Sequence, residues 1–141
     1  MANINLEIYL FFKGECLEAM NFYKSVFGGE LNVTTYKDAG VDAEGTSPDW
    51  LMHASLEGGE VKLMGSDTAQ ASPVAKKVSL SLGGTDEARM REIFDALSAG
   101  GKVFSPLKKE AWGDLFGSFT DRYGVEWMMN IGAPKEGEGN V

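Results

Sequence analysis

Hydrophobic residues recur along the chain with two periods, two residues in some segments and three to four in others. The first period is typical of a half-buried strand and the second of an amphipathic helix. In the first half of the chain these patterns predict strand 6–12, helix 15–27, strand 31–36, strand 50–56 and strand 60–64. The apolar stripe of the helix is predicted to contain Leu17, Met20, Tyr23 and Phe27. Gly28 and Gly29 are expected to end it, because glycine readily adopts the left-handed conformation of helix C-termini.

The second half of the chain repeats this order of elements. It is predicted to contain strand 77–82, a helix that begins after the cap Thr85, and strands 102–107, 115–120 and 125–131. The apolar stripe of this helix is predicted to consist of Met90, Ile93, Phe94 and Leu97. The two predicted helices match each other at a shift of 71 residues, which indicates an internal duplication.

Three segments of the chain show neither period. Residues 38–49 are rich in turn-forming and acidic residues, so they are predicted to form the longest loop. The predicted organisation is one domain over residues 1–131, with modules at about 4–65 and 77–131, a linker at 66–76 and a flexible tail at 132–141. The predicted fold class is α+β. Two βαβββ modules are expected to form a curved mixed sheet, with helices outside and a pocket on the concave side.

Charge and cysteine content narrow the possible partners. The chain carries 13 Lys and Arg against 21 Asp and Glu, a formal net charge of −8 at pH 7. An acidic surface repels phosphate groups, so neither a nucleic acid nor an anionic membrane is an expected partner. No apolar stretch is long enough to cross a membrane, and no secretory signal is recognisable. Because Cys16 is the single cysteine, no internal disulfide is expected and a cytoplasmic location is predicted.

Short motifs spread over almost the whole chain carry a resemblance to a known family. They lie at residues 18–24 (EAMNFYK), 27–31, 52–54, 63–67, 78–82, 112–113, 116–117 and 121–130 (DRYGVEWMMN). As a set they resemble the PhnB-like branch of the glyoxalase, bleomycin resistance and dioxygenase superfamily, also called the vicinal oxygen chelate superfamily. This resemblance implies a paired βαβββ fold that is usually dimeric, so a homodimer is expected.

The resemblance also implies where a metal ion would be held. Enzymes of the superfamily commonly bind a divalent metal through four side chains, mostly His and Glu, on four strands. The corresponding positions here are Ile8, Leu63, Lys77 and Met128, and a shift of one residue gives Glu7, Lys62, Lys76 and Glu126. The first set offers no suitable ligand for such an ion, and the two carboxylates and two lysines of the second set do not make a four-ligand site. No cofactor is therefore predicted.

Members of this branch are often labelled 3-demethylubiquinone 3-methyltransferases. The chain has no glycine-rich strand-to-helix turn of the kind that a Rossmann-type cofactor site needs, so methyl transfer is not expected.

His53 is the only histidine and therefore the only side chain with an unperturbed pKa near neutrality. It is a candidate catalytic base or an anchor for an acidic substrate. The alternative is a strand histidine that merely hydrogen-bonds to a neighbour. Cys16 lies on the apolar stripe of its helix, so burial is expected rather than reactivity.

Alternation on two strands of the second half predicts a polar sheet face. The residues expected to line it, together with aromatic residues at its rim and near the long loop, are Lys77, Ser79, Ser81, Glu126, Met128, Asn130, Trp112, Phe116, Trp50 and Tyr36. A few polar groups in an apolar cup suit a small organic ligand. A solvent-exposed sheet face without a ligand is the alternative. Trp127 is expected in the core.

The function predicted from the sequence is that of a PhnB-like protein that binds a small organic molecule without the usual metal. One alternative is a glyoxalase- or dioxygenase-type enzyme with Zn, Ni, Mn or Fe, held by a set such as His53, Glu57 and Glu110. The other alternative is a non-catalytic dimeric scaffold.

Overall fold

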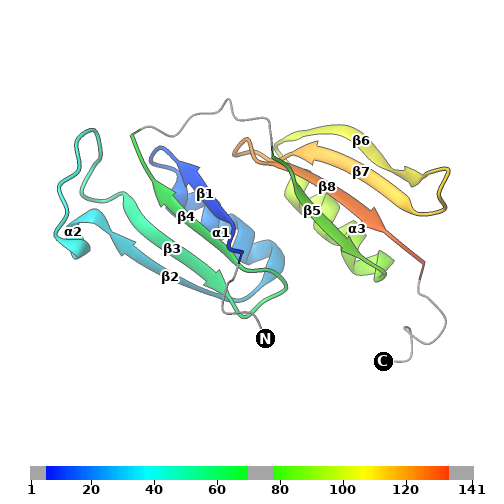
Figure 1. Ribbon diagram of the computed structural model, residues 1–141, viewed down its shortest axis with the longest axis horizontal. Helices are drawn as coiled ribbons and strands as arrows, with labels where there is room; N and C mark the ends of the chain where they lie inside the picture. The colour runs from blue at the N-terminus through cyan, green and yellow to red at the C-terminus, as the bar shows by residue number, and fades with distance from the viewer. Residues whose placement is uncertain (1–5, 70–77, 134–141) are drawn as a thin grey trace. The chain divides into compact units, whose positions relative to one another are not determined.

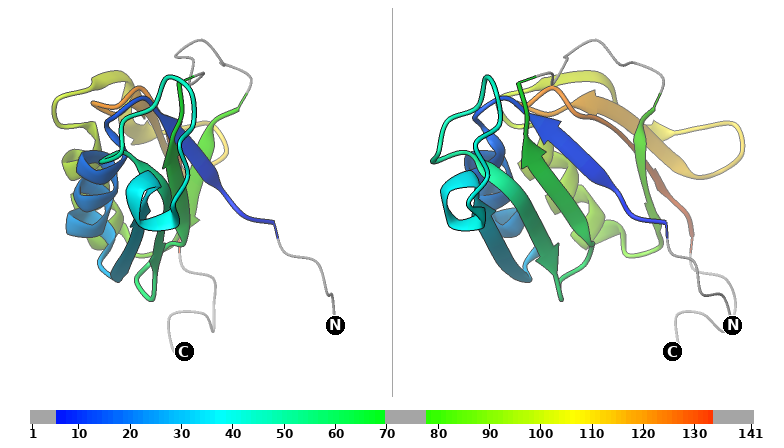
Figure 2. Two further views of the ribbon diagram at one scale, coloured as in Figure 1. Left: turned by 90° about the vertical axis from the view of Figure 1, so that its left-hand side faces the viewer. Right: turned by 60° about the vertical axis from the view of Figure 1, so that its left-hand side comes forward.

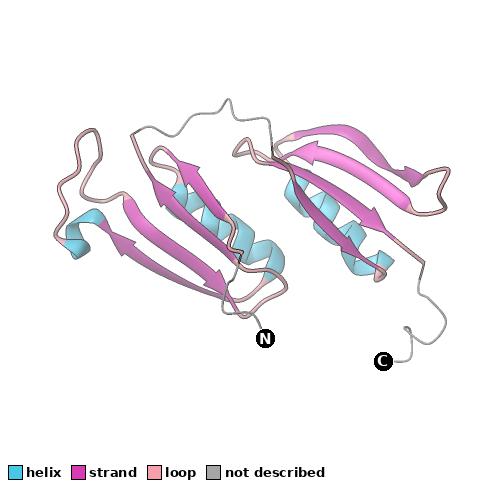
Figure 3. Cartoon of the chain, viewed as in Figure 1, coloured by secondary structure: helices cyan, strands magenta, loops and turns pink. Residues whose placement is uncertain are grey.

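The computed structural model describes residues 6–69 and 78–133, and its chain divides into two compact units, Met1–Pro73 and Val74–Val141. Each unit contains a four-stranded mixed sheet and one helix of twelve residues. Figure 3 shows that the order of helix and strands is the same in both units, apart from a short extra helix in the first. No helix in the described part of the chain is long and apolar enough to cross a membrane.

The first unit has the strand order β1-β4-β3-β2 (Figure 1). Its elements are β1 (Tyr9–Phe12), α1 (Cys16–Phe27), β2 (Glu30–Thr35), α2 (Tyr36–Ala39), β3 (Leu51–Glu57) and β4 (Leu63–Asp67). Strands β1 and β4 are parallel, whereas the other neighbours are antiparallel. Figure 2 shows α1 packed against one face of this sheet.

The second unit has the equivalent strand order, β5-β8-β7-β6. Its elements are β5 (Leu80–Gly84), α3 (Glu87–Ser98), β6 (Lys102–Lys109), β7 (Leu115–Thr120) and β8 (Glu126–Ile131). Here β5 and β8 are the parallel pair. Helices α1 and α3 begin and end at residues that are 71 apart. The duplication predicted from the sequence is therefore confirmed.

Two glycines show which face of each sheet is packed against its helix. A Cβ atom on Gly65 would lie 3.0 Å from Cys16 Sγ on α1, and one on Gly117 would lie 2.8 Å from the Phe94 ring on α3. Residues that are paired with these glycines or alternate with them by two therefore point toward the helix. We call the opposite side of each sheet its open face.

Helix α1 buries Cys16, Ala19, Met20, Tyr23, Val26 and Phe27. Leu17, which was predicted in this stripe, is instead 47% exposed, because the buried face of the helix is centred on Ala19 and Tyr23 and Leu17 lies outside it. In α3 the predicted stripe is confirmed, since Met90, Ile93, Phe94 and Leu97 are all buried. Trp127 is also buried, as expected.

Several predicted boundaries were wrong in ways that have a physical cause. Helix α3 is capped by Asp86, whose carboxylate accepts from the Arg89 N–H at 3.2 Å, and not by Thr85. Strand β4 continues to Asp67, two residues into the predicted linker, because its partner β1 runs alongside it to the same point. Residues 70–77 and 134–141, which contain most of that linker and most of the predicted tail, lie outside the described residues.

The predicted long loop begins later than expected, because Tyr36–Ala39 forms the short helix α2. Thr35 and Asp38 form a capping box there. The Thr35 hydroxyl accepts from the Asp38 N–H at 3.0 Å, and the Asp38 carboxylate accepts from the Thr35 N–H at 3.4 Å. This reciprocal pair satisfies the first free donors of a helix and so ends strand β2 at Thr35.

The carboxylate of Asp67 connects three parts of the first unit. It is 1% exposed and accepts hydrogen bonds from the N–H groups of Gly14 at 2.7 Å, Cys16 at 3.0 Å and Leu51 at 3.0 Å. The residue that precedes α1, Glu15, makes no capping hydrogen bond through its own side chain. Asp67 therefore caps α1 from a distant strand and also fixes the start of β3.

We expect the substitution Asp67→Ala to lower the free energy of unfolding by about 3 kcal/mol, because it leaves three N–H groups, two of them buried, without an acceptor. Asp67→Asn, which keeps one acceptor oxygen, should have a free energy of unfolding between those of the wild-type protein and Asp67→Ala. Urea denaturation measures both. The exposed Asp42→Ala variant is the control and should change stability by less than about 0.5 kcal/mol. Equal effects of Asp67→Ala and the control would contradict this role.

Candidate functional site

The open face of the second sheet carries most of the residues predicted to bind a ligand. Across β7 and β8, Phe116 pairs with Asn130 and Ser118 with Met128, while Ser81 on β5 also pairs with Met128. Paired residues point to the same side of a sheet. These side chains consequently lie together on the side away from α3, as the alternation in the sequence predicted.

Trp112 is an exposed aromatic residue with a fixed position beside this face. Its side chain is 61% exposed, yet its Nε1–H donates to Asn130 Oδ1 at 3.2 Å. The indole also meets the Phe116 ring edge-on, with the ring centres 6.2 Å apart. Asn130 in turn donates through Nδ2 to Asp114 Oδ2 at 2.9 Å. These contacts hold the indole in place while most of its surface remains available to a ligand.

Ser79 and Glu126 form a second polar pair on the open face. The Ser79 hydroxyl donates to a Glu126 carboxylate oxygen at 3.4 Å, a long hydrogen bond that a ligand group can replace. Glu126 pairs with Thr120 across the sheet, which places its carboxylate beside another hydroxyl. Lys77, which was predicted to add an ammonium group, lies outside the described residues.

Sequence reasoning missed Asp114, which orients the Asn130 carboxamide. The residue lies two positions after Trp112, in the connection between β6 and β7. That connection is tight, since the Glu110 N–H donates to the Asp114 carbonyl oxygen at 2.9 Å. A polar residue in a short hairpin loop beside an aromatic residue is the signal that could have drawn attention to it.

His53 lies on the open face of the first sheet, and its side chain forms a hydrogen bond with that of Tyr9. The Tyr9 hydroxyl oxygen is 2.6 Å from His53 Nδ1, and the two rings are tilted at 50° with centres 5.7 Å apart. Burial, followed by the charges of Cys16 and Tyr36, raises the pKa of Tyr9 above its usual value of 10. Tyr9 was not among the predicted site residues, because it comes from a strand 44 positions away in sequence.

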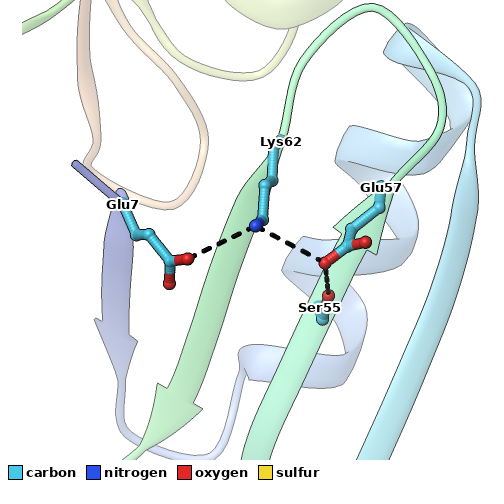
Figure 4. Close-up of polar contacts among 4 residues, drawn as sticks. All are labelled: Glu7, Ser55, Glu57 and Lys62. Atoms are coloured by element: carbon cyan, nitrogen blue, oxygen red, sulfur yellow. Dashed lines mark hydrogen bonds and ion pairs between the residues drawn. The ribbon is translucent and has the colours of Figure 1, made fainter. Parts of the chain in front are cut away.

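The ammonium group of Lys62 lies between two carboxylates on the same open face, as Figure 4 shows. Its Nζ is 3.3 Å from Glu7 Oε1 and 3.7 Å from Glu57 Oε1, and Glu57 also accepts from the Ser55 hydroxyl at 3.1 Å. All three charged side chains are about half exposed, so the ion pairs contribute little to stability. Their effect on the cluster is that one ammonium group offsets one of the two carboxylate charges.

These residues do not fit the divalent metal that the resemblance implied. Leu63 is 1% exposed and pairs with the buried Leu56, so it belongs to the helix face and not to the open face. Lys62, its neighbour, is the residue that reaches the open face, and an ammonium group repels a metal ion. Within residues 6–69 and 78–133, no group of three or more His, Cys, Asp or Glu side chains could hold a metal ion.

The two aromatic residues predicted near the long loop have structural contacts. The Trp50 indole packs against the backbone of Gly14, where an added Cβ would lie 3.1 Å from its Nε1. Tyr36 is 8% exposed, and its hydroxyl donates to the Asp67 carbonyl oxygen at 2.7 Å. Tyr36 also lines a hollow of about 300 Å³ between α2 and the following loop, together with Val41 and Pro48.

Cys16 is fully buried at the start of α1, as expected from its place on the apolar stripe. Burial, followed by the nearby Asp67 carboxylate, raises the pKa of its thiol from 9.0 to about 12. Because the thiolate is the nucleophilic form of cysteine, this side chain is inert in the folded protein.

Comparison with known proteins identifies the family to which this chain is similar. The family model described as 3-demethylubiquinone-9 3-methyltransferase matches residues 5–130. Protein YjdN from Escherichia coli (strain K12) is 28% identical over 138 residues, which cover 89% of this chain and 94% of YjdN.

Solved structures share the fold. Protein PA1353 from Pseudomonas aeruginosa superposes with a TM-score of 0.76 at 37% identity, covering 92% of this chain and 99% of PA1353. A putative 3-demethylubiquinone-9 3-methyltransferase, PhnB protein, from Bacillus cereus gives a TM-score of 0.74 at 24% identity, covering 92% of this chain and 100% of that protein. Proteins of the glyoxalase, bleomycin resistance and dioxygenase superfamily match at 11–13% identity, a likeness of fold alone.

We expect Cys16 to resist iodoacetamide in the folded protein at about pH 8 and to react once guanidinium chloride unfolds it. The folded-state pKa lies above the unfolded-state value. The free energy of unfolding should therefore fall as the pH rises from 9.0 to about 12. Mass spectrometry of the labelled protein and urea denaturation at several pH values measure these effects. Rapid labelling without unfolding would contradict them.

Proposed function

The chain belongs to the family described as 3-demethylubiquinone-9 3-methyltransferase, and we propose that it binds a small organic molecule on the open face of its second sheet. It is a PhnB-like protein with the glyoxalase and bleomycin resistance fold. That fold supports many unrelated activities, so the proposal depends on the side chains of this chain and not on the family description.

The observation that carries the proposal is the exposed but immobilised indole of Trp112. Most of the Trp112 side chain faces water, and its apolar surface contributes hydrophobic free energy only when a ligand or another surface covers it. Its hydrogen bond to Asn130 and its edge contact with Phe116 fix the orientation in advance. Because these side chains are fixed before binding, the protein loses less side-chain entropy on association.

The polar groups beside Trp112 determine which ligands suit this face. Asn130 is the hydrogen-bond partner of the indole and is itself bonded to Asp114. The Ser79–Glu126 pair lies at the opposite end of β8, where the strand begins. Hydroxyl, carboxamide and carboxylate groups at the edge of an aromatic surface are typical of sites for small polar organic molecules. A flat ligand whose ring rests on Trp112 and whose polar groups reach Asn130 or Glu126 meets this arrangement.

We further propose that binding takes place without the divalent metal that is usual in the superfamily, and that the chain does not transfer methyl groups. The ion pairs of Lys62 with Glu7 and Glu57 support the first point, because the ammonium group that lies between these two carboxylates repels a metal cation. The absence of a glycine-rich strand-to-helix turn in the sequence supports the second.

We expect native mass spectrometry of protein purified from cells to show a bound organic compound, and Trp112→Ala to bind that compound about tenfold more weakly. The control is Val103→Ala, which shortens an exposed apolar side chain of the same unit that pairs with Phe119 and so lies on the helix side of the sheet, and it should leave binding unchanged. Equal binding by Trp112→Ala and the wild-type protein would refute the site. So would wild-type protein that carries no compound.

Elemental analysis of the purified protein tests the proposal that no divalent metal is bound. Protein purified without a chelator should contain much less than one equivalent of Zn, Ni, Mn or Fe per chain. Stoichiometric metal that survives dialysis would instead favour the alternative of a metal-dependent glyoxalase- or dioxygenase-type enzyme.

A further inference from the structure

A hydrogen bond on the open face of the first sheet joins two strands that are not neighbours. Tyr9 belongs to β1 and His53 to β3, and strand β4 runs between them (Figure 1). Tyr9 and Ser55 both pair with Met64 on β4, so the Tyr9 hydroxyl passes over this strand and reaches His53 diagonally. The side chain of Met64 is consequently covered and only 9% exposed.

The chemistry of the two groups fixes the position of the proton. A phenol is a better donor than a neutral imidazole N–H, and an imidazole nitrogen is a better acceptor than a phenol oxygen. The raised pKa of Tyr9 keeps its hydroxyl protonated at neutral pH. Tyr9 therefore donates to His53 Nδ1, and the neutral ring carries its own hydrogen on Nε2. His53 then acts toward a ligand as a hydrogen-bond donor and not as a base.

The Nε2–H group has no acceptor among the residues that the structure describes, since the contact with Tyr9 uses Nδ1. The imidazole is only half-buried, so a molecule from solution can reach it. A donor that is oriented through its other ring nitrogen and remains free at its outer nitrogen is suited to an oxygen of a ligand.

The surroundings of His53 indicate whether a neutral or a charged ligand suits this donor. Phe11 is 60% exposed and stacks on Tyr9, with ring centres 5.3 Å apart, so an aromatic surface adjoins the donor. The charged side chains on the same open face include Glu7, Glu30 and Glu57 against the single ammonium group of Lys62, a sum of two negative charges. Anionic ligands are therefore disfavoured relative to neutral ones.

From this arrangement we propose that Tyr9, His53 and Phe11 form a binding site in the first unit for a neutral aromatic compound that bears a carbonyl oxygen. Tyr9 orients the imidazole, the Nε2–H of His53 donates to the carbonyl oxygen, and Phe11 supports the aromatic ring. This site uses no residue of the second unit, so it stands or falls separately from the binding proposed at Trp112.

The first test is the position of the imidazole proton, measured by the nitrogen NMR shifts of protein labelled with ¹⁵N-histidine. Because the chain has a single histidine, the signals need no assignment. In the neutral ring the Nε2–H form should predominate, and Tyr9→Phe should move both nitrogen shifts. The control Tyr123→Phe removes a hydroxyl in the other unit and should move neither. A predominant Nδ1–H form would overturn the proposal.

The second test is binding of benzamide, followed by the same histidine signals and by calorimetry. His53→Ala should weaken binding about threefold to tenfold, the effect of losing one hydrogen bond. His53→Gln, whose amide can still donate, should recover part of this loss. Benzoate, which has the same ring and a negative charge, should bind more weakly than benzamide.

The outcomes separate the two sites. Trp112→Ala should leave the benzamide-induced shifts of His53 unchanged. If Trp112→Ala abolishes benzamide binding and His53→Ala does not, the site in the first unit is refuted while that in the second is supported. Tighter binding of benzoate than of benzamide would also refute the proposed ligand class.

Discussion

The first unit depends on one buried carboxylate that replaces a missing helix cap. Asp67 is the last residue of β4, yet its two oxygens accept from the turn before α1, from the first residue of α1 and from the first residue of β3. Its backbone carbonyl holds Tyr36 at the start of α2. A helix whose adjoining residue lacks a side-chain cap can begin at Cys16 only because a distant strand delivers this acceptor. The relation of β1, α1 and β3 thus follows from the end of β4.

The second unit has the same topology but places its buried carboxylate elsewhere. Asp121 follows β7 and accepts from the N–H groups of Tyr123 and Val125 and from the Trp127 indole. It closes the turn between β7 and β8 and at the same time positions a core tryptophan. The duplication therefore preserved the pattern of apolar residues and the order of the strands, whereas each copy satisfies its buried donors in its own way. Polar contacts in one unit are a poor guide to those in the other.

The sequence predicted those parts of the fold that depend on period and on glycine. Both long helices, the order of strands and the polar face of β5 and β8 were found as expected, since alternation and helical spacing determine them locally. The hydrogen bond of Tyr9 to His53 and that of Trp112 to Asn130 could not be predicted, because each depends on strand register between distant segments. The position of Lys62 between Glu7 and Glu57 has the same origin. A shift of one residue in the register would have turned Leu63 outward and Lys62 inward.

Gly65 and Gly117 have a consequence for how this architecture can change. Each lacks the one carbon that would keep helix and sheet apart, so the spacing between the two layers is set by a single position in each half. A methyl group there would act as a wedge on the buried side, and the residues that face outward would keep their identities. The contacts that hold helix to sheet and the residues proposed to bind ligands therefore lie on opposite surfaces of the same strands. A substitution at either glycine would change the packing of the scaffold and leave the outward-facing side chains unaltered.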